Sequence, residues 1–468
     1  MTAIRSHPYM ANSNERDRNA LLEGIGIDDV EELFEQIPKD HFTSYVFDLP
    51  DALISEVSLR RELTNVISRN SDCQSSLSFL GGGVWQHHVP AICDEVWQRS
   101  EFLTSVWGTG SSDVGRNQAW FEYASQLAEL VGLDFVGLPV YSWGAAVGHS
   151  MRMAARITGR SKVLVPANMS PERLSVARTY CGNPQQNDYI TVVTVAIDPS
   201  TGRMNLTDLH AKLDDSTAAV YIENPSYLGL IEQDAFTIAR AARAIGAETV
   251  VGVDPSSLGI IAEPSSYGAD IVVGTTQPLG VHMNGGGGVG GFIATRDSET
   301  YAREYPTLQV SITDTTRVDE IGFGMPLFEQ SSYGSRENAN DWTGNSVYLW
   351  AIANAVYMSS LGPQGFRELG STIVQHSHYA AGRLGDLPGV SIQWPDGFFK
   401  EFVVNLNDTG RTVGEVDEFL RGRNIFGGID LSNDFPDLGQ ALLVAVTEIH
   451  TMADIDRFVD NLREAVTE

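Results

Sequence analysis

The sequence predicts an α/β protein, with a large doubly wound domain followed by a small C-terminal α+β domain. Between residues 145 and 296, short segments rich in Val and Ile alternate with amphipathic helical segments, which is typical of a mostly parallel sheet covered on both faces. The chain has 468 residues, more than one small core needs. Its 42% hydrophobic and 19% charged residues indicate a chain that folds throughout.

Three regions are expected along the chain. Residues 1–62 form an N-terminal helical arm, residues 63–310 the large domain, and residues 311–468 the small domain. In the large domain a helix over 118–131 follows a polar, Gly-rich stretch at 108–116, and a second helix covers 145–158. A third helix begins after Ser170 as N-cap, with Pro171 in its first position.

Strands and further helices follow from the same patterns. Strands are expected at 162–166, 189–197, 218–224, 249–254, 270–276 and 290–296, with a helix over 234–247. In the small domain we expect a helix over 347–361, strands at 401–406 and 441–448, and a last helix over 453–466. Thr451 and Asp454 form a near capping box at the start of that helix.

Charge and composition exclude several classes of protein. With 31 basic and 60 acidic residues the formal charge is −29, which repels nucleic acid and anionic lipid. The three cysteines have neither disulfide-framework nor zinc-ligand spacing, which fits a reducing cytoplasm. We find no apolar leader and no apolar run long enough to cross a membrane, so a cytoplasmic location is expected.

Two conspicuous motifs indicate no chemistry of their own. The run NGGGGVGG (284–291) lacks the Lys-Ser/Thr of a P-loop and precedes a strand, so it predicts a close-packed turn or, alternatively, a close approach to a ligand or partner chain. His87 and His88 are adjacent and cannot point to one face, so no metal site is predicted. No GxSxG or Cys/His pattern indicates a catalytic nucleophile.

Asp254 is the most informative single residue. It follows a buried strand, at the sheet edge where α/β folds bind ligands. In enzymes that use pyridoxal 5'-phosphate (PLP), such an Asp pairs with the pyridinium nitrogen of the cofactor. The residues alone leave a second interpretation open, in which Asp254 caps the turn before Pro255.

Many ordered segments together resemble a known family. They include IGIDDVEELFEQIP, SFLGGGVWQHHVPAICDEVWQRSEFLTS, QLAELVGLD, ENPSYLGLIEQ, GADIVVGTTQPLGV, YMSSLGPQGFRELG, FFKEFVVNL and ALLVAVTEIHTMADIDRFVDNL. Over essentially its whole length the chain resembles subunit 1 of the two-subunit glycine decarboxylase, the P-protein of the glycine cleavage system. This resemblance implies the PLP-dependent transferase fold type I, which is the aspartate aminotransferase-like architecture.

The resemblance also implies partners and a division of labour. The expected assembly is α2β2, in which a subunit 2-like chain holds PLP on its lysine, decarboxylates glycine, and passes the aminomethyl group to a lipoyl carrier, the H-protein. Subunit 1 resembles a degenerate copy that completes an interfacial cleft. No PLP is expected to be bound covalently to this chain.

The lysine content agrees with this expectation. The chain has four lysines, Lys39, Lys162, Lys212 and Lys400, and none closely follows the strand GADIVVG. Gln277 and Pro278 stand near the place expected for a Schiff-base lysine, and neither can form an imine. The vestigial cofactor cleft implied by the fold consists of Ser142, Trp143, Gly144, Asn224, Asp254, Thr276 and Gln277. Because Trp143 replaces a small residue, protein rather than PLP is a candidate to fill this cleft.

Departures from the family pattern keep other functions open. They fall in SVWGTGSSDVGRN (105–117), in 336–340 and in 141–144, all loop-like stretches where functional residues concentrate. One alternative is a repurposed PLP heteromer that acts on another small amino acid or on a carrier-bound substrate. Another is a catalytically dead binding or scaffold protein.

Overall fold

The computed structural model describes residues 9–10, 13–41, 48–102, 110–326, 332–340, 342–343 and 347–467. The chain divides into two compact units, Met1–Asn70 and Ser71–Glu468. The first unit contains α1 (Glu15–Ile25), the 3-10 helix η1 (Val30–Phe34) and α2 (Glu56–Ile67), where the sequence predicts helices. The side chains of Asn14, Asp29 and Ser55 cap their first turns.

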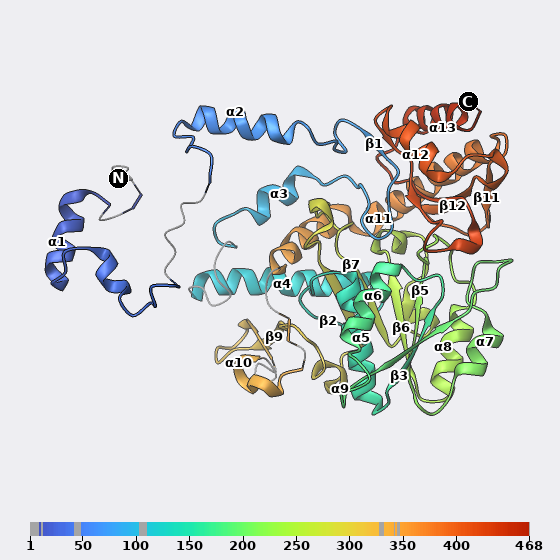
Figure 1. Cartoon of the computed structure of the whole chain (residues 1–468). Coiled ribbons are helices and arrows are strands. Elements are labelled where there is room, and N and C mark those ends of the chain that lie inside the picture. Colours follow the sequence, from blue (N-terminus) through green and yellow to red (C-terminus); the bar gives the residue numbers. More distant parts are fainter. Residues whose placement is uncertain are drawn as a thin grey trace. The chain divides into compact units, whose positions relative to one another are not determined.

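A seven-stranded sheet forms the centre of the second unit (Figure 1). Its strands are β2 (Phe135–Val136), β3 (Lys162–Pro166), β4 (Thr191–Val195), β5 (Thr217–Glu223), β6 (Glu248–Val253), β7 (Ile271–Thr275) and β8 (Gly291–Thr295). Their spatial order is β2-β8-β7-β6-β5-β3-β4. Strands β3 to β7 run parallel, whereas β8 is antiparallel to β7 and β2 is antiparallel to β8. All six strands predicted in the large domain are present.

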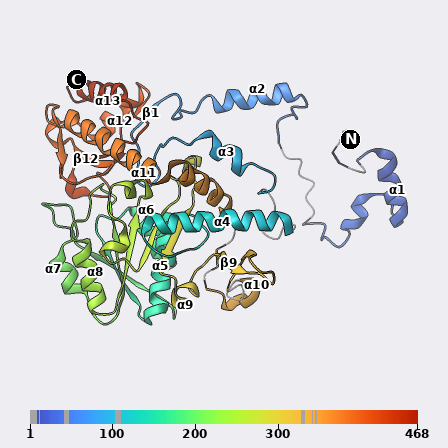
Figure 2. The ribbon, with the colours of Figure 1, turned by 180° about the vertical axis from the view of Figure 1, so that it is seen from behind.

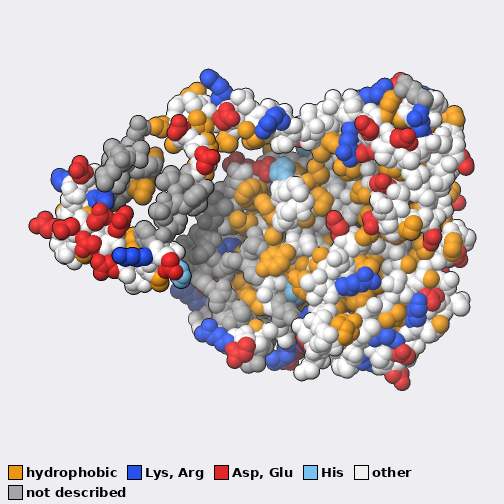
Figure 3. Space-filling view, in the orientation of Figure 1, with side chains coloured by type: hydrophobic (Ala, Val, Ile, Leu, Met, Phe, Trp, Pro, Cys, Tyr) orange, Lys and Arg blue, Asp and Glu red, His pale blue; other side chains and the backbone are white. Residues whose placement is uncertain are grey.

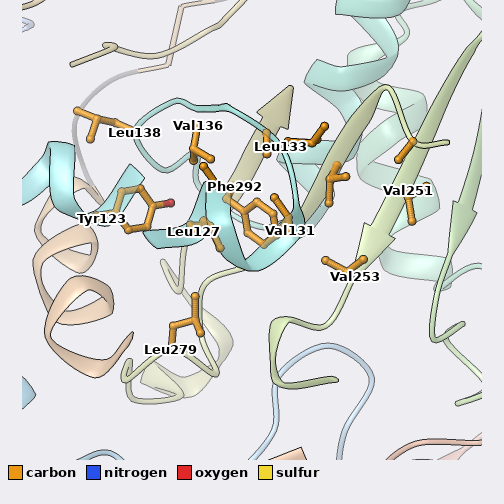
Figure 4. Close-up of a cluster of buried hydrophobic side chains, with 14 of the residues drawn as sticks. Tyr123, Leu127, Val131, Leu133, Val136, Leu138, Val251, Val253, Leu279 and Phe292 are labelled. Carbon is orange, nitrogen blue, oxygen red and sulfur yellow. The ribbon is translucent and has the colours of Figure 1, made fainter. Parts of the chain in front are cut away.

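Helices cover both faces of this sheet, as Figures 1 and 2 show. Successive residues of β7 point to opposite faces, so Val272 packs in one buried cluster while Ile271 and Val273 pack in another. The first cluster contains residues of α4 (Gly110–Val131) and α8 (Ala235–Ala244). Figure 4 shows its α4 side chains Tyr123, Leu127 and Val131 gathered beside Phe292 of β8. The second contains residues of α5 (Trp143–Thr158) and α6 (Pro171–Tyr180). The doubly wound prediction is therefore confirmed.

The start of α4 differs from the prediction. The sequence predicts that the helix begins only after the Gly-rich stretch 108–116, but the chain is helical from Gly110, and residues 108–109 lie outside the described residues. Arg116, the last residue of that stretch, and the adjacent Asn117 are both buried, and their burial stabilises a helix start that propensity alone does not favour.

A second, four-stranded antiparallel sheet lies in the C-terminal region. Its order is β11 (Ser391–Gln393), β12 (Glu401–Asn405), β15 (Ala441–Ala445) and β14 (Ile429–Asp430). The helices α12 (Val413–Arg421) and α13 (Met452–Thr467) pack against it. The predicted box at the start of α13 is present, because Thr451 and Asp454 each bond the other's backbone N–H.

One long helix joins the two sheets. Helix α11 (Tyr348–Gly385) is interrupted at Gly362, whose φ is 61°, and Pro363 follows inside the helix. The part before Gly362 packs in the cluster of the seven-stranded sheet, and the part from Ala380 onward packs in the cluster of the four-stranded sheet. A short parallel pair, β1 (Leu77–Ser78) with β13 (Ile425–Phe426), holds the start of the loop 79–90 against the C-terminal region.

The remaining elements are shorter. They are α3 (Ala91–Trp97), α7 (Leu206–Lys212), α9 (Glu299–Ala302), α10 (Ser332–Ser335), and the antiparallel pair β9 (Ser311–Asp314) and β10 (Ile321–Gly324). In the part of the chain that the structure describes, no helix is both long and apolar enough to cross a membrane. Figure 3 shows the acidic side chains of the second unit scattered over the visible face rather than gathered in one patch.

Candidate functional site

The predicted cleft residues lie at the carboxyl ends of neighbouring strands. Asn224 follows β5, Asp254 follows β6, and Thr276 and Gln277 follow β7. Ser142 caps the N-terminus of α5, where its Oγ accepts a hydrogen bond from the N–H of Ala145. The parallel sheet thus places these residues along one edge, where ligands bind in open α/β folds.

Asp254 is buried and already paired. Its Oδ2 lies 2.7 Å from the ammonium nitrogen of Lys400, and both side chains are almost inaccessible, with 5% and 2% exposed. Ser256 donates to both oxygens of Asp254, at 2.8 and 2.9 Å from its Oγ, and the Ser256 N–H donates to Oδ1 at 3.0 Å. Asp254 therefore caps the turn after β6, as the second interpretation of the sequence predicts, and its carboxylate pairs with a lysine of the same chain.

Lys400 has several other neighbours. Its Nζ donates to Nε2 of His87 at 2.9 Å and to Oγ of Ser256 at 3.2 Å, and it lies 3.5 Å from the ring centroid of Trp85. Burial lowers the pKa of the Lys400 ammonium, and the adjacent carboxylate of Asp254 acts in the opposite direction. The Nζ of Lys400 is thus enclosed by protein groups that bond to it.

The contacts of His87 extend this network to Glu448. Its Nδ1 lies 2.7 Å from Oε2 of Glu448, and Nε2 accepts from Lys400, so Nδ1 must be the nitrogen that donates. The N–H of His88 donates to the other carboxylate oxygen at 2.8 Å. Burial alone would raise the pKa of Glu448, but its interaction with His87 and the His88 N–H lower that pKa to about 2.

Trp143 occupies the first turn of α5, inside the predicted cleft. Arg173 stacks on its ring, with 4.0 Å between the guanidinium carbon and the ring centroid. The guanidinium is itself fixed by two hydrogen bonds to Glu223, at 2.7 and 2.9 Å, and Tyr221 donates to Glu223 at 2.9 Å. Trp143 is 6% exposed, so it acts as part of the core.

Gln277 holds a neighbouring loop. Its Oε1 accepts from the N–H of Trp85 at 3.1 Å, and its Nε2 donates to the carbonyl of Trp85 at 3.0 Å. The same Nε2 donates to the carbonyl of Val281 at 3.2 Å. This amide therefore pins the loop that presents Trp85 and His87 to Lys400.

The other predicted residues serve the backbone. Thr276 donates through Oγ1 to the carbonyl of Val289. The Oδ1 of Asn224 accepts from the N–H of Glu232 at 3.1 Å. Gly144 lies within α5, where a Cβ would meet Val176 at 3.1 Å. None of these three has a contact that points to a cofactor.

The Gly run 284–291 is close-packed only at its end. A Cβ on Gly291 would lie 2.2 Å from the carbonyl oxygen of Ser142, and one on Gly290 would lie 2.4 Å from Oγ1 of Thr276. By contrast, Gly285, Gly286 and Gly288 have no heavy atom within 4 Å of such a Cβ. The expected tight turn is therefore found next to β8, not throughout the run.

The geometry does not fit PLP in this cleft. The cavity lined by Trp85, Trp143, Arg173, Asp254, Lys400 and their neighbours has a volume of about 10 Å³. Small-molecule sites measure roughly 300–1,000 Å³, whereas 10 Å³ is about the space of one water molecule. Lys400 is also wrongly placed for a Schiff base. Its Nζ contacts Asp254, the acid that would pair with the ring nitrogen of PLP, whereas a Schiff-base lysine must reach the aldehyde carbon across the ring from that nitrogen.

Sequence reasoning placed Trp143 and Asp254 in this cleft but missed Lys400 and His87. Lys400 lies in the segment FFKEFVVNL, and the sequence around His87 offers no sign of a lysine partner. Lys400 lies 146 positions after Asp254 and immediately before β12, so nothing in local pattern pairs them. The available signal is that Lys400 directly follows Phe398 and Phe399, because a lysine in an apolar segment is buried only when an opposite charge pairs with it.

Comparison with known proteins decides the family. The model of the glycine cleavage system P-protein family matches residues 8–462. The chain belongs to this family. The probable glycine dehydrogenase (decarboxylating) subunit 1 of Staphylothermus marinus is 36% identical over 471 residues, covering 99% of both chains. A protein of the same name from Thermococcus onnurineus is 35% identical, covering 97% of this chain and 99% of its own.

Solved structures agree with the sequence relatives. A crystal structure of glycine decarboxylase (P-protein) of the glycine cleavage system, in inhibitor-bound form, matches with a TM-score of 0.85 and 31% identity, covering 98% of this chain and all of that one. A sphingosine-1-phosphate lyase of Burkholderia pseudomallei, at 17% identity and a TM-score of 0.63, shares the fold alone. The predicted fold type I of PLP-dependent transferases is confirmed. The name "subunit 1" implies that those relatives work with a second subunit.

Proposed function

We propose that this chain is the non-lysine subunit of a glycine decarboxylase that works in the glycine cleavage system. A second, lysine-bearing subunit would bind PLP, and this chain would complete the assembled enzyme without a cofactor of its own. The expected assembly is α2β2 in the cytoplasm, and a lipoyl carrier protein would accept the aminomethyl group after glycine loses its carboxylate as CO2.

One observation supports this division of labour most strongly. The acid that would bind the cofactor ring nitrogen is bonded to Lys400 at 2.7 Å, in a cavity of about 10 Å³. Yet the chain keeps the family fold over 98% of its length, relative to the P-protein crystal structure. A chain that keeps the scaffold while its own cleft is filled is best explained as a subunit that supports a partner's site.

One departure from the family pattern, Trp143, gives no support to another substrate. Trp143 packs against Arg173 and Trp85 inside this chain's own filled cleft. It therefore changes a place where no substrate of this chain would bind. The segment 105–117 lies largely outside the part whose side chains the structure describes.

Reconstitution of glycine-dependent CO2 exchange tests the proposal. Labelled CO2 should enter glycine only when this chain, the lysine-bearing partner, PLP and a lipoyl carrier protein are all present. Omission of this chain, with the other three present, is the matched control and should abolish exchange. An assembled, PLP-loaded pair that ignores glycine but turns over another amino acid would refute glycine as the substrate. Full exchange by the partner alone would refute the need for this subunit.

A further inference from the structure

Lys400 is the most deeply buried of the four lysines, and Lys39 is exposed. The side chain of Lys400 is 2% exposed, whereas those of Lys162 and Lys212 are 14% and 34% exposed. An ammonium group at such a site requires compensation by partners, because its water shell has been removed. Asp254, His87 and Ser256 supply three hydrogen-bonding atoms, and the ring of Trp85 covers the group at 3.5 Å.

These partners come from three separate parts of the fold. Asp254 and Ser256 follow β6 of the seven-stranded sheet. Lys400 directly precedes β12 of the four-stranded sheet, and Glu448, which bonds His87, follows β15 of that sheet. His87 and Trp85 lie in the loop 79–90, which Gln277 holds to the end of β7. One ammonium group therefore joins both sheets and the loop between them.

We infer that Lys400 is an internal substitute for a cofactor: its ammonium group neutralises Asp254 and ties the C-terminal four-stranded sheet to the carboxyl edge of the seven-stranded sheet. In a cofactor-binding chain of this fold, the ring nitrogen would meet the acid in that place. Here a side chain of the C-terminal region does so, and the cleft is closed by the protein itself. The inference goes beyond the proposed function, because it holds whatever substrate the assembled enzyme uses.

The energetic consequence is asymmetric. Removal of Lys400 alone leaves the carboxylate of Asp254 buried without its cation, and removal of Asp254 alone leaves the ammonium group without its anion. Breaking a buried pair in this way shifts the unfolding equilibrium by roughly a hundredfold or more. Replacing both partners with neutral groups of similar size removes both uncompensated charges, so the double variant should lose less than the two single variants together.

A double-mutant cycle on the full chain tests this inference. The variants are Lys400→Met, Asp254→Asn and the double variant, each followed by urea unfolding and by hydrogen exchange detected by mass spectrometry. Each single variant should raise the unfolding constant by roughly a hundredfold. The unfolding constant of the double variant should rise at least tenfold less than the product of the two single fold-changes. In the single variants, exchange should accelerate in β12 and in the loop 79–90 but not in β4.

Lys162→Met is the matched control. Lys162 forms an ion pair with Asp214, whose side chain is 58% exposed, so its loss should change the unfolding constant by only a fewfold. Single variants that behave like Lys162→Met, or a double variant whose effect is the sum of the two, would overturn the inference. Should a single variant fail to fold, a double variant that folds would support the pairing, and a double variant that also fails would overturn it.

A rescue experiment separates charge from packing. In Lys400→Ala, ethylammonium should raise the melting temperature above the value in equimolar potassium chloride, because the small cation can pair with Asp254 in the opened space. The wild-type chain should show no such difference. Equal effects of the two salts on Lys400→Ala would contradict the cation-substitute role. These stability measurements do not depend on glycine, so they can fail while the exchange assay succeeds, and the reverse.

Discussion

At the scale of single residues, Gln277 holds the loop that closes the cleft. From the sequence, the position of a Schiff-base lysine is expected near Gln277, which is fully buried at the end of β7. Both ends of its amide bond the backbone of Trp85, whose ring in turn covers Lys400. The amide of Gln277 and the backbone of Trp85 are thus hydrogen-bonded to each other within the core.

Substitution of Gln277 should therefore affect stability without creating a cofactor site. In Gln277→Ala the N–H and carbonyl of buried Trp85 lose their partner, which should lower the free energy of unfolding by about 2–4 kcal/mol. The exposed Gln118→Ala is the control and should change it by less than about 0.5 kcal/mol. Urea denaturation measures both.

The lysine variant at the same position gives a sharper result. Gln277→Lys should form no borohydride-reducible aldimine with PLP, since the cavity among Trp143, Arg173 and Lys400 is about 10 Å³. A reducible PLP adduct on Gln277→Lys would show that the cleft opens readily and would contradict this account of a filled site.

At the scale of elements, α11 connects the two halves of the second unit. Its periodicity predicts a helix only over 347–361, because Gly362 and Pro363 are strong helix-ending signals. The structure stops regular geometry at Gly362 and then resumes the helix to Gly385. The predicted end at Leu361 therefore coincides with the irregular residue, but the helix continues beyond it, because the second half is held by packing against the four-stranded sheet rather than by local propensity.

A pair of glycine substitutions tests this view of α11. Gly362 has a φ of 61°, which an L side chain adopts poorly although there is open space for a Cβ, so Gly362→Ala should lower the free energy of unfolding by about 1 kcal/mol or more. Gly382 lies in the helical second half with equally open surroundings, so Gly382→Ala should raise stability by about 0.5–1 kcal/mol. Thermal unfolding of both variants checks the sign. The same sign for both would contradict the break at Gly362.

At the scale of the whole molecule, sequence reasoning recovered the architecture better than the site. The strand pattern of 162–296 predicted the doubly wound sheet because burial on both faces leaves a strong local signal of Val and Ile. Asp254 could be placed at a ligand-binding edge for the same reason. Its partner Lys400 could not, because only tertiary folding brings β12 to the end of β6.

The most direct test of the central claim is the location of PLP in the assembled enzyme. The co-purified pair is loaded with PLP, reduced with borohydride, digested, and searched by mass spectrometry for pyridoxyl-lysine in both subunits. We predict one pyridoxyl group for each pair of different subunits, found entirely on a lysine of the partner. A pyridoxyl group on any lysine of this chain, Lys400 included, would contradict the account.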